Sequence, residues 1–220
     1  MPIAAQCRAA LTAIGMLSLA ACAAQPLSTG LQQAEQNYPP MIPAVNVHPT
    51  DGSGPYPLSC PAPGSRVEQR GGPAMEFFGA DPSNPDLCRM RIDNQSPTAW
   101  YGIWVTDWPG ADQAYPALKR VIQGPTGTVA AFDTIVEPGI EWHDLIRNEG
   151  LEDLPLLGKT YRALKISHYR EGFGGNTYRS VSTVWKDLPT GLLLYGTYQH
   201  IAGRPELDGA FTPTAIIPAR

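Results

Sequence analysis

The sequence is short of positive charge, which argues against proteins that bind polyanions through a basic surface. Its 16 lysine and arginine residues are outnumbered by 20 aspartate and glutamate residues, and the formal net charge is −4 at pH 7. This balance gives no electrostatic footprint for nucleic acid or for anionic lipid head groups. We therefore expect no nucleic-acid partner.

Long apolar runs are also missing, except for one near the start. Residues 9–20 are apolar apart from Thr12 and Ser18, and Arg8 precedes them. A run of about 12 residues is too short for a permanent span, which needs ~20, but it suits the apolar region of an export signal. No later segment approaches 18 continuous apolar residues. We expect residues 1–21 to be a removable signal peptide, with no second span.

The end of this run carries a short motif. Leu19-Ala20-Ala21-Cys22 places a branched apolar residue and two small residues before a cysteine. The motif resembles the lipobox of bacterial lipoproteins, which implies cleavage before Cys22 and attachment of fatty acyl chains such as palmitate to its sulfur. Several acyl chains hold a protein stably at a membrane. Residue 23 is alanine and not the aspartate that favours inner-membrane retention, so the resemblance implies the outer membrane, facing the periplasm. The alternative is an ordinary secretory signal cut at a small-x-small site.

Cysteines are few, and their positions are informative. Cys7 lies in the signal and Cys22 is assigned to lipid, which leaves Cys60 and Cys88. In an oxidising compartment two remaining cysteines are a natural disulfide pair, although two free thiols stay possible. Closing this loop would stabilise the fold by roughly 3–4 kcal/mol in the chain-entropy model.

Proline divides the chain into a tether and a body. Nine prolines fall between residues 23 and 64, including Tyr38-Pro39-Pro40. Such a composition propagates neither helix nor central strand and indicates a semi-extended tether. We assign residues 22–59 to the lipidated N-terminus and this Pro-rich tether, and residues 60–220 to a single β-rich domain.

The body has the pattern of strands, and we predict a mainly β fold (β-rich α+β), a curved antiparallel sheet or meander with one or two short helices. Residues 66–79 indicate a hairpin, residues 88–92 alternate as a half-buried strand, and residues 100–107 read as another strand. Apolar residues recur at helical spacing in residues 113–123. Residues 160–171, 177–186 and 192–201 predict three strands of a meander. If the turns are simple, one face of the meander is the core; it carries Leu164, Ile166, His168, Val181, Thr183, Trp185, Leu192, Leu194, Tyr198 and His200.

A second resemblance covers residues 140–200. It rests on the run Glu152-x-Leu154-x-Leu156-x-Gly158-x-Thr160-Tyr161, followed by Thr183-x-Trp185-x-Asp187 and Gly191-Leu192. This run resembles uncharacterised periplasmic proteins with curved antiparallel sheets, similar in outline to the lipoprotein carriers of outer-membrane localisation. The resemblance implies a fold and no particular activity.

Aromatic residues provide the best candidate for a binding site. On a strand, Trp100, Trp104 and Trp108 would share a face and could stack on the sugar rings of a glycan or on another ligand. The alternative is that these indoles fill the interface between sheet and helix, since aromatic residues dominate core energetics.

The sequence contains no clear motif for a catalytic site or a metal site. His48, His143, His168 and His200 have no spacing that supplies three or four converging ligands, so we expect no metal and no cofactor. Trp142-His143-Asp144 could hold a base and its orienting group, but no strained nucleophile accompanies it. The carboxylates of Glu149, Glu152 and Asp153 are expected to flank an exposed turn. We predict no catalytic residues.

Three functions follow, in decreasing order of support. The first is a non-enzymatic envelope accessory or interaction protein, anchored by lipid, with an envelope protein or glycan as partner. The second is a carrier or binding module that holds a hydrophobic or glycan ligand in the concavity of the sheet. The third is a hydrolase.

Overall fold

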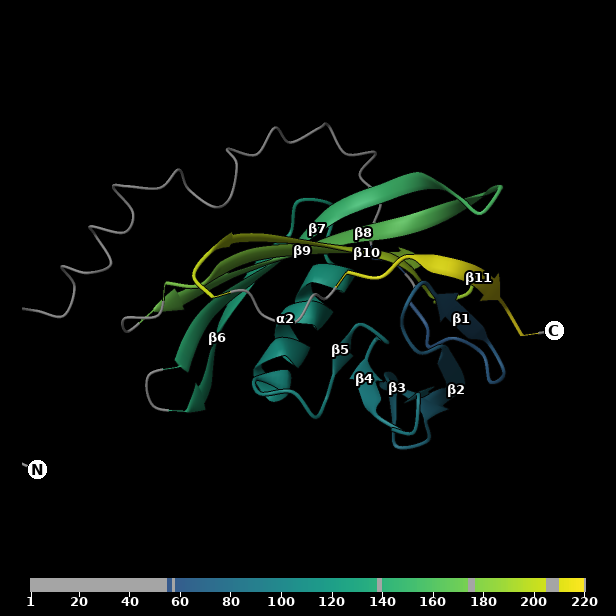
Figure 1. The fold of residues 1–220 in the computed structure, drawn as a ribbon, viewed down its shortest axis with the longest axis horizontal. Coiled ribbons are helices and arrows are strands. Elements are labelled where there is room, and N and C mark those ends of the chain that lie inside the picture. The colour runs from purple at the N-terminus through teal and green to yellow at the C-terminus, as the bar shows by residue number, and fades with distance from the viewer. Residues whose placement is uncertain (1–54, 57, 138–139, 174–176, 205–209, 220) are drawn as a thin grey trace, which may run out of the picture. The chain divides into compact units, whose positions relative to one another are not determined.

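The two sheets of this protein, and the helix that packs on one of them, are drawn in Figure 1. The structure is a computed structural model and describes residues 55–56, 58–137, 140–173, 177–204 and 210–219. No helix in these ranges is both long and apolar enough to cross a membrane. The predicted signal, Cys22, His48 and nearly all of the predicted tether lie outside the described residues.

The larger sheet has five strands, which are longer than most strands of the second sheet, and it arches over the helix (Figure 1). Its order is β10-β9-β8-β7-β6, and every neighbouring pair is antiparallel. The strands are β6 (Val129–Glu137), β7 (Ile140–Leu156), β8 (Lys159–Phe173), β9 (Arg179–Asp187) and β10 (Leu193–Ala202). The predicted meander is confirmed in β8, β9 and β10.

Strand β7 is the longest of the described strands, and the sequence pattern did not predict it. Glu149, Glu152 and Asp153 lie within β7 and not beside an exposed turn, so that expectation is wrong. The physical reason is a register shift between Asn148 and Gly150, which breaks the alternation of apolar and polar residues into two halves that are out of phase. The buried Asn148 side chain uses this irregularity to donate to the Val121 carbonyl at the end of the helix.

The register of β9 also differs from the expected one. Ile166 pairs with Val184 and His168 pairs with Ser182, so Ser180, Ser182 and Val184 share the concave face. The prediction had placed Val181, Thr183 and Trp185 there. A change of one residue in a connecting turn moves every side chain of a strand to the other face, which is why the simple-turn assumption failed here. For β10, Tyr198 was correctly placed, since it pairs with Ser182.

The helix α2 (Ala111–Gln123) covers the concave face near β6 and β7. Its apolar residues at helical spacing are all buried, as the sequence predicts: Ala114, Ala117, Leu118, Val121 and Ile122. They form one core cluster with residues of the sheet that include Ile146, Leu164 and Ile166. This packing holds α2 under the arch.

Six short strands form the second sheet, in the order β11-β1-β2-β3-β4-β5. They are β1 (Arg66–Gln69), β2 (Met75–Asp81), β3 (Asn84–Ile92), β4 (Thr98–Trp100), β5 (Trp104–Val105) and β11 (Pro213–Ile217). The predicted hairpin of β1 and β2 and the alternating strand β3 are confirmed.

The strand predicted over residues 100–107 is wrong. The chain turns back between β4 and β5, with positive φ at Tyr101 (52°) and Gly102 (65°), so Trp100 and Trp104 become cross-strand partners. A β-rich composition hides this turn because Tyr101 is a residue that rarely takes positive φ. The three tryptophans therefore do not form a row on one strand.

The two sheets are joined by a core cluster and by the segment that precedes β1. Cys60 in this segment forms a disulfide with Cys88 of β3, and their Cα atoms are 5.2 Å apart. The turn between β9 and β10 packs against the same segment, because a Cβ at Gly191 would lie 2.1 Å from the Ser59 carbonyl oxygen. Only glycine permits this approach, and Gly191 also has a φ of 69°.

Candidate ligand-binding site

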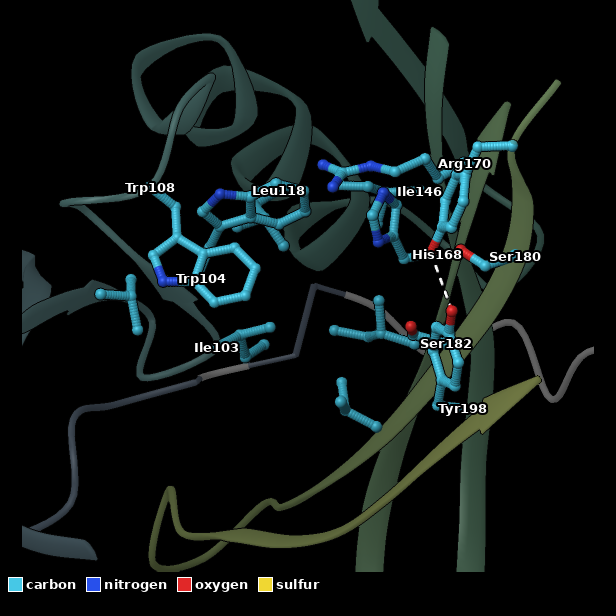
Figure 2. A pocket seen from close by; sticks show the side chains of 14 residues that line it. Ile103, Trp104, Trp108, Leu118, Ile146, His168, Arg170, Ser180, Ser182 and Tyr198 are labelled. Atoms are coloured by element: carbon cyan, nitrogen blue, oxygen red, sulfur yellow. Dashed lines mark hydrogen bonds between the residues drawn. The ribbon is translucent and has the colours of Figure 1, made fainter. Parts of the chain in front are cut away.

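A cavity of about 200 Å³ lies between the concave face of the larger sheet, helix α2 and the segment of residues 103–108. Figure 2 shows the side chains that line it. Apolar residues form its base: Leu118 from α2, Ile146 from β7, Ile166 from β8 and Val184 from β9. These residues belong to the core cluster under the arch or pack against it, so the cavity is an extension of the core toward solvent.

One wall of the cavity is aromatic and aliphatic. It is made by Trp104 of β5, by Trp108 in the loop that leads to α2, and by Ile103 (Figure 2). The Trp104 indole meets the Phe132 ring edge-on at 5.5 Å and the His168 ring at 4.9 Å, which fixes its orientation. Trp108 is 59% exposed, so it stands at the mouth of the cavity.

The facing wall carries hydroxyl groups. Ser180 and Ser182 on β9 and Tyr198 on β10 point into the cavity (Figure 2). The hydroxyls of Tyr198 and Tyr178 form a hydrogen bond of 3.0 Å, which ties β10 to the start of β9. The cavity is therefore apolar on one side and polar on the other.

A buried charged cluster borders this polar side. Asp144 of β7 is inaccessible to solvent and lies 2.7 Å from Nε2 of His168 and 2.7 Å from Nε of Arg170, both on β8. Because an ionised carboxylate only accepts hydrogen bonds, His168 must carry a proton on Nε2. Thr134 of β6 donates its hydroxyl to the other carboxylate oxygen at 2.7 Å. Asp144 therefore orients two side chains that line the cavity.

The charge on Asp144 is set by its neighbours. Burial alone would raise the pKa of this carboxyl group, but the His168 hydrogen bond and the charges of His168 and Arg170 outweigh it and lower the pKa to about 2. Asp144 is thus an anion at any physiological pH, and it balances the charge of Arg170.

Two further contacts position the cluster. The Arg170 guanidinium lies over the Trp142 ring, 4.2 Å from its centroid, and 5.9 Å from that of Trp104. Gly110, at the start of α2, approaches Thr134 so closely that a Cβ would lie 2.4 Å from its hydroxyl oxygen. A side chain at Gly110 would therefore displace the donor that holds Asp144.

Residue types of a catalytic triad occur here, but the arrangement favours binding. Asp144, His168 and Ser182 lie on β7, β8 and β9, and Ser182 is the cross-strand partner of His168. Among the described residues, however, no hydrogen bond joins Ser182 to His168. A nucleophile needs that contact with its base, together with donors for an oxyanion. In the described part of the chain no three or more His, Cys, Asp or Glu side chains gather as metal ligands.

A second, more open cavity of about 400 Å³ lies beside Tyr56, Tyr101 and Asp86. Its lining includes Pro55, Tyr56 and Leu58, which come from the short described ranges that precede β1. The cavity under the arch, which is lined by residues of both the sheet and the helix, is the better candidate.

Comparisons with known proteins give limited help. No family model matches the chain, and no curated protein sequence does. A solved structure of the hypothetical lipoprotein YmcC from Escherichia coli is similar over 63% of this chain and 79% of that chain, with 12% sequence identity and a TM-score of 0.40. We infer neither fold, anchor nor ligand from a likeness of this degree.

The sequence-predicted site residues have different outcomes. The Cys60–Cys88 disulfide is present. Trp104 and Trp108 both line the cavity, but Trp100 does not; its ring stacks on Tyr115 with centroids 4.2 Å apart. Cys22 lies outside the described residues, and its lipidation stays a prediction.

The pairing of His143 with Asp144 is not formed. Adjacent residues on a strand point to opposite faces, so the exposed His143 contacts Asp133 at 2.7 Å while the buried Asp144 contacts His168. Sequence reasoning missed Arg170, Ser180 and Ser182 as candidates. The alternation of His168 and Arg170 with Ser167 and Tyr169 on β8 was the available signal, since two basic residues share the face that otherwise carries Leu164 and Ile166.

Proposed function

We propose that this protein is a lipid-anchored, non-enzymatic protein of the cell envelope that binds a small ligand in the cavity under its curved sheet. The observation that carries the ligand-binding part is the cavity itself, in which a buried charged cluster borders an otherwise apolar pocket. A few well-placed polar groups in an apolar pocket are typical of small-molecule sites.

The anchor is supported by sequence. The run of residues 9–20 and the motif Leu19-Ala20-Ala21-Cys22 fit an exported precursor that is cut before Cys22 and acylated there. The Cys60–Cys88 disulfide suits an oxidising compartment. Alanine at residue 23 supports the outer membrane, with the domain facing the periplasm.

A binding module accounts for the structure better than a protein that acts only through its outer surface. Five large apolar side chains are exposed in the described ranges, each from a different stretch of the chain: Trp108, Ile135, Leu157, Ile201 and Ile217. The cavity is the feature that gathers aromatic, polar and charged side chains in one place.

The proposal is tested by blocking the cavity. Ser182→Phe places a ring in the cavity, whereas Thr183→Phe, the adjacent position on β9, places the same ring on the other face of the sheet. A panel of ring-sized polar and apolar compounds is screened by saturation-transfer NMR against the full-length protein in nonionic detergent. We expect binding to the unsubstituted protein and to Thr183→Phe, and none to Ser182→Phe. Absence of binding by every compound, or equal binding by both variants, contradicts the proposal.

The anchor is tested separately. The unsubstituted protein should partition into the detergent phase, and its N-terminal peptide should carry acyl mass on Cys22. Cys22→Ser should move the protein to the aqueous phase or leave the signal uncleaved. An unmodified N-terminus at any residue other than 22 would refute this part of the proposal.

A further inference from the structure

We infer that the ligand is a single sugar ring, the end of a glycan or a free monosaccharide, held between the tryptophan wall and the serine wall of the cavity. The inference rests on the proposed function and specifies its ligand. It follows from the serine hydroxyls, from the two-sided chemistry of the walls and from the size of the cavity.

The two serine hydroxyls indicate a polar ligand. Ser180 is only 3% exposed, and both Ser180 and Ser182 line the cavity (Figure 2). Neither hydroxyl has a hydrogen-bond partner among the residues that the structure describes. Both hydroxyl oxygens face the cavity, so an apolar occupant would cover them and leave them without a partner, at a cost of roughly 1–3 kcal/mol each. An occupant that donates or accepts hydrogen bonds is therefore favoured over a hydrocarbon. A hydroxyl-bearing ligand would satisfy both serines at once.

The opposite wall indicates a ligand with an apolar face. Trp104 and Trp108 present indole surface to the cavity, and Trp108 is 59% exposed. A pyranose ring has one face made of C–H groups and an edge made of hydroxyls. Stacking the first on an indole brings the second toward Ser180 and Ser182, so one ring matches both walls.

The volume limits the ligand to one ring. A cavity of about 200 Å³ is close to the ~150 Å³ that accommodates benzene, and it is below the ~300–1,000 Å³ of sites for larger ligands. A long acyl chain would not fit. Because Trp108 is both part of the lining and exposed, the remainder of a glycan would leave the cavity past this residue. The protein would therefore recognise the end of a glycan.

The charged groups that border the cavity bond to one another. Nε of Arg170 and Nε2 of His168 each lie 2.7 Å from the Asp144 carboxylate, which has no access to solvent. We therefore assign contact with the ring to the serine hydroxyls and the tryptophans.

The experiment measures binding of D-glucose, D-galactose and N-acetylglucosamine to the full-length protein. Saturation-transfer NMR is the readout, in a polyoxyethylene detergent, because detergents with sugar head groups would compete. Benzyl alcohol and octanoate are the apolar probes. For one ring we expect a dissociation constant on the order of 1 mM for at least one sugar, as the free energy available per ligand atom implies.

Substitutions in the tryptophan wall and in the serine wall test whether the sugar binds between them. Trp108→Ala should weaken sugar binding about tenfold, and Ser182→Ala about fivefold, which corresponds to the loss of one stacking contact and one hydrogen bond. Ile135→Ala is the matched control, because Ile135 is a large exposed side chain (66%) that does not line the cavity. It should bind sugar as the unsubstituted protein does.

The outcomes separate the two proposals. Sugar binding that is weakened by both wall variants and kept by the control supports the inference. If benzyl alcohol or octanoate binds and no sugar does, the inference is overturned while the ligand-binding function stands. If no probe binds, both fail. Sugar binding that Trp108→Ala leaves unchanged also overturns the inference, since the ring would then lie elsewhere.

Discussion

The buried Asp144 cluster offers a sharp test of the structure, because the same sheet contains an exposed pair of the same residue types. Asp144 and His168 lie 2.7 Å apart, and so do Asp133 and His143. The difference is solvent: the Asp144 side chain is 0% exposed, whereas the side chain of Asp133 is 61% exposed. The two pairs therefore have the same distance between carboxylate and imidazole and differ in the burial of the carboxylate.

The substitution Asp144→Asn keeps the shape of the side chain and removes its charge. It removes the carboxylate charge that lies 2.7 Å from Nε of Arg170, whose side chain is 6% exposed. Breaking a buried pair on one side costs about 3–5 kcal/mol of the free energy of unfolding. The matched control Asp133→Asn should cost about 0–1 kcal/mol, since water screens exposed pairs.

The pH dependence gives the cluster a second signature. The pKa of Asp144 is lowered to about 2 in the folded protein from its ordinary value of 3.8. The unfolded chain therefore binds a proton more readily between these values, so the stabilisation is complete above about pH 4 and is lost as the pH falls through 2. We expect the difference between the unsubstituted protein and Asp144→Asn to shrink by about 1 kcal/mol between pH 5 and pH 3.

Urea unfolding followed by circular dichroism measures both effects, at pH 7, 5 and 3. The m-value should be the same for each variant, so that a shift in midpoint reports stability alone. Equal losses for Asp144→Asn and Asp133→Asn would refute the buried cluster. A difference that does not change between pH 5 and pH 3 would refute the lowered pKa.

Three other predictions use different parts of the chain. Replacing Cys60 and Cys88 together by alanine should lower the free energy of unfolding by about 3–4 kcal/mol in urea, and reduction of the unsubstituted protein should have the same effect. Burial lowers the pKa of Lys186 to about 7 from 10.5, so the unfolded chain binds more protons between these values and stability should rise with pH across them. Lys186→Met should abolish this rise in urea titrations at pH 7 and pH 9, and a rise that persists would assign it to another group. Gly191→Ala should destabilise the fold measurably in thermal unfolding, because its Cβ would collide with the Ser59 carbonyl, whereas Gly158→Ala has open space and serves as the control for positive φ.

Local patterns were enough for the regular parts of the fold. The spacing of apolar residues in α2 and the alternation in β3 and β8 depend on neighbours in sequence, and these elements were predicted correctly. The disulfide followed from the small number of cysteines. Where one irregular residue changes the phase, as at Gly150 in β7 or Tyr101 between β4 and β5, the local pattern misled.

The candidate site could be predicted only in part, for the same reason. Two of its aromatic residues, Trp104 and Trp108, stood out in the sequence, but their partners did not. Which face Ser180 and Ser182 take depends on the register of β9 against β8, and a single residue in the turn reverses it. The contact of Asp144 with His168 joins residues 24 positions apart, which no short motif encodes.

By itself, then, the sequence determined the β-rich class, the amphipathic helix, the disulfide and the expectation of an exported, lipid-anchored chain, because each of these depends on composition or on spacing along the chain. The tertiary structure alone decided that a helix lies under a curved sheet, that a carboxylate is buried between two basic side chains, and that serines face tryptophans across a cavity. Strand register and sheet curvature create these juxtapositions, and both are properties of the packed molecule, since they depend on contacts between residues far apart in the chain.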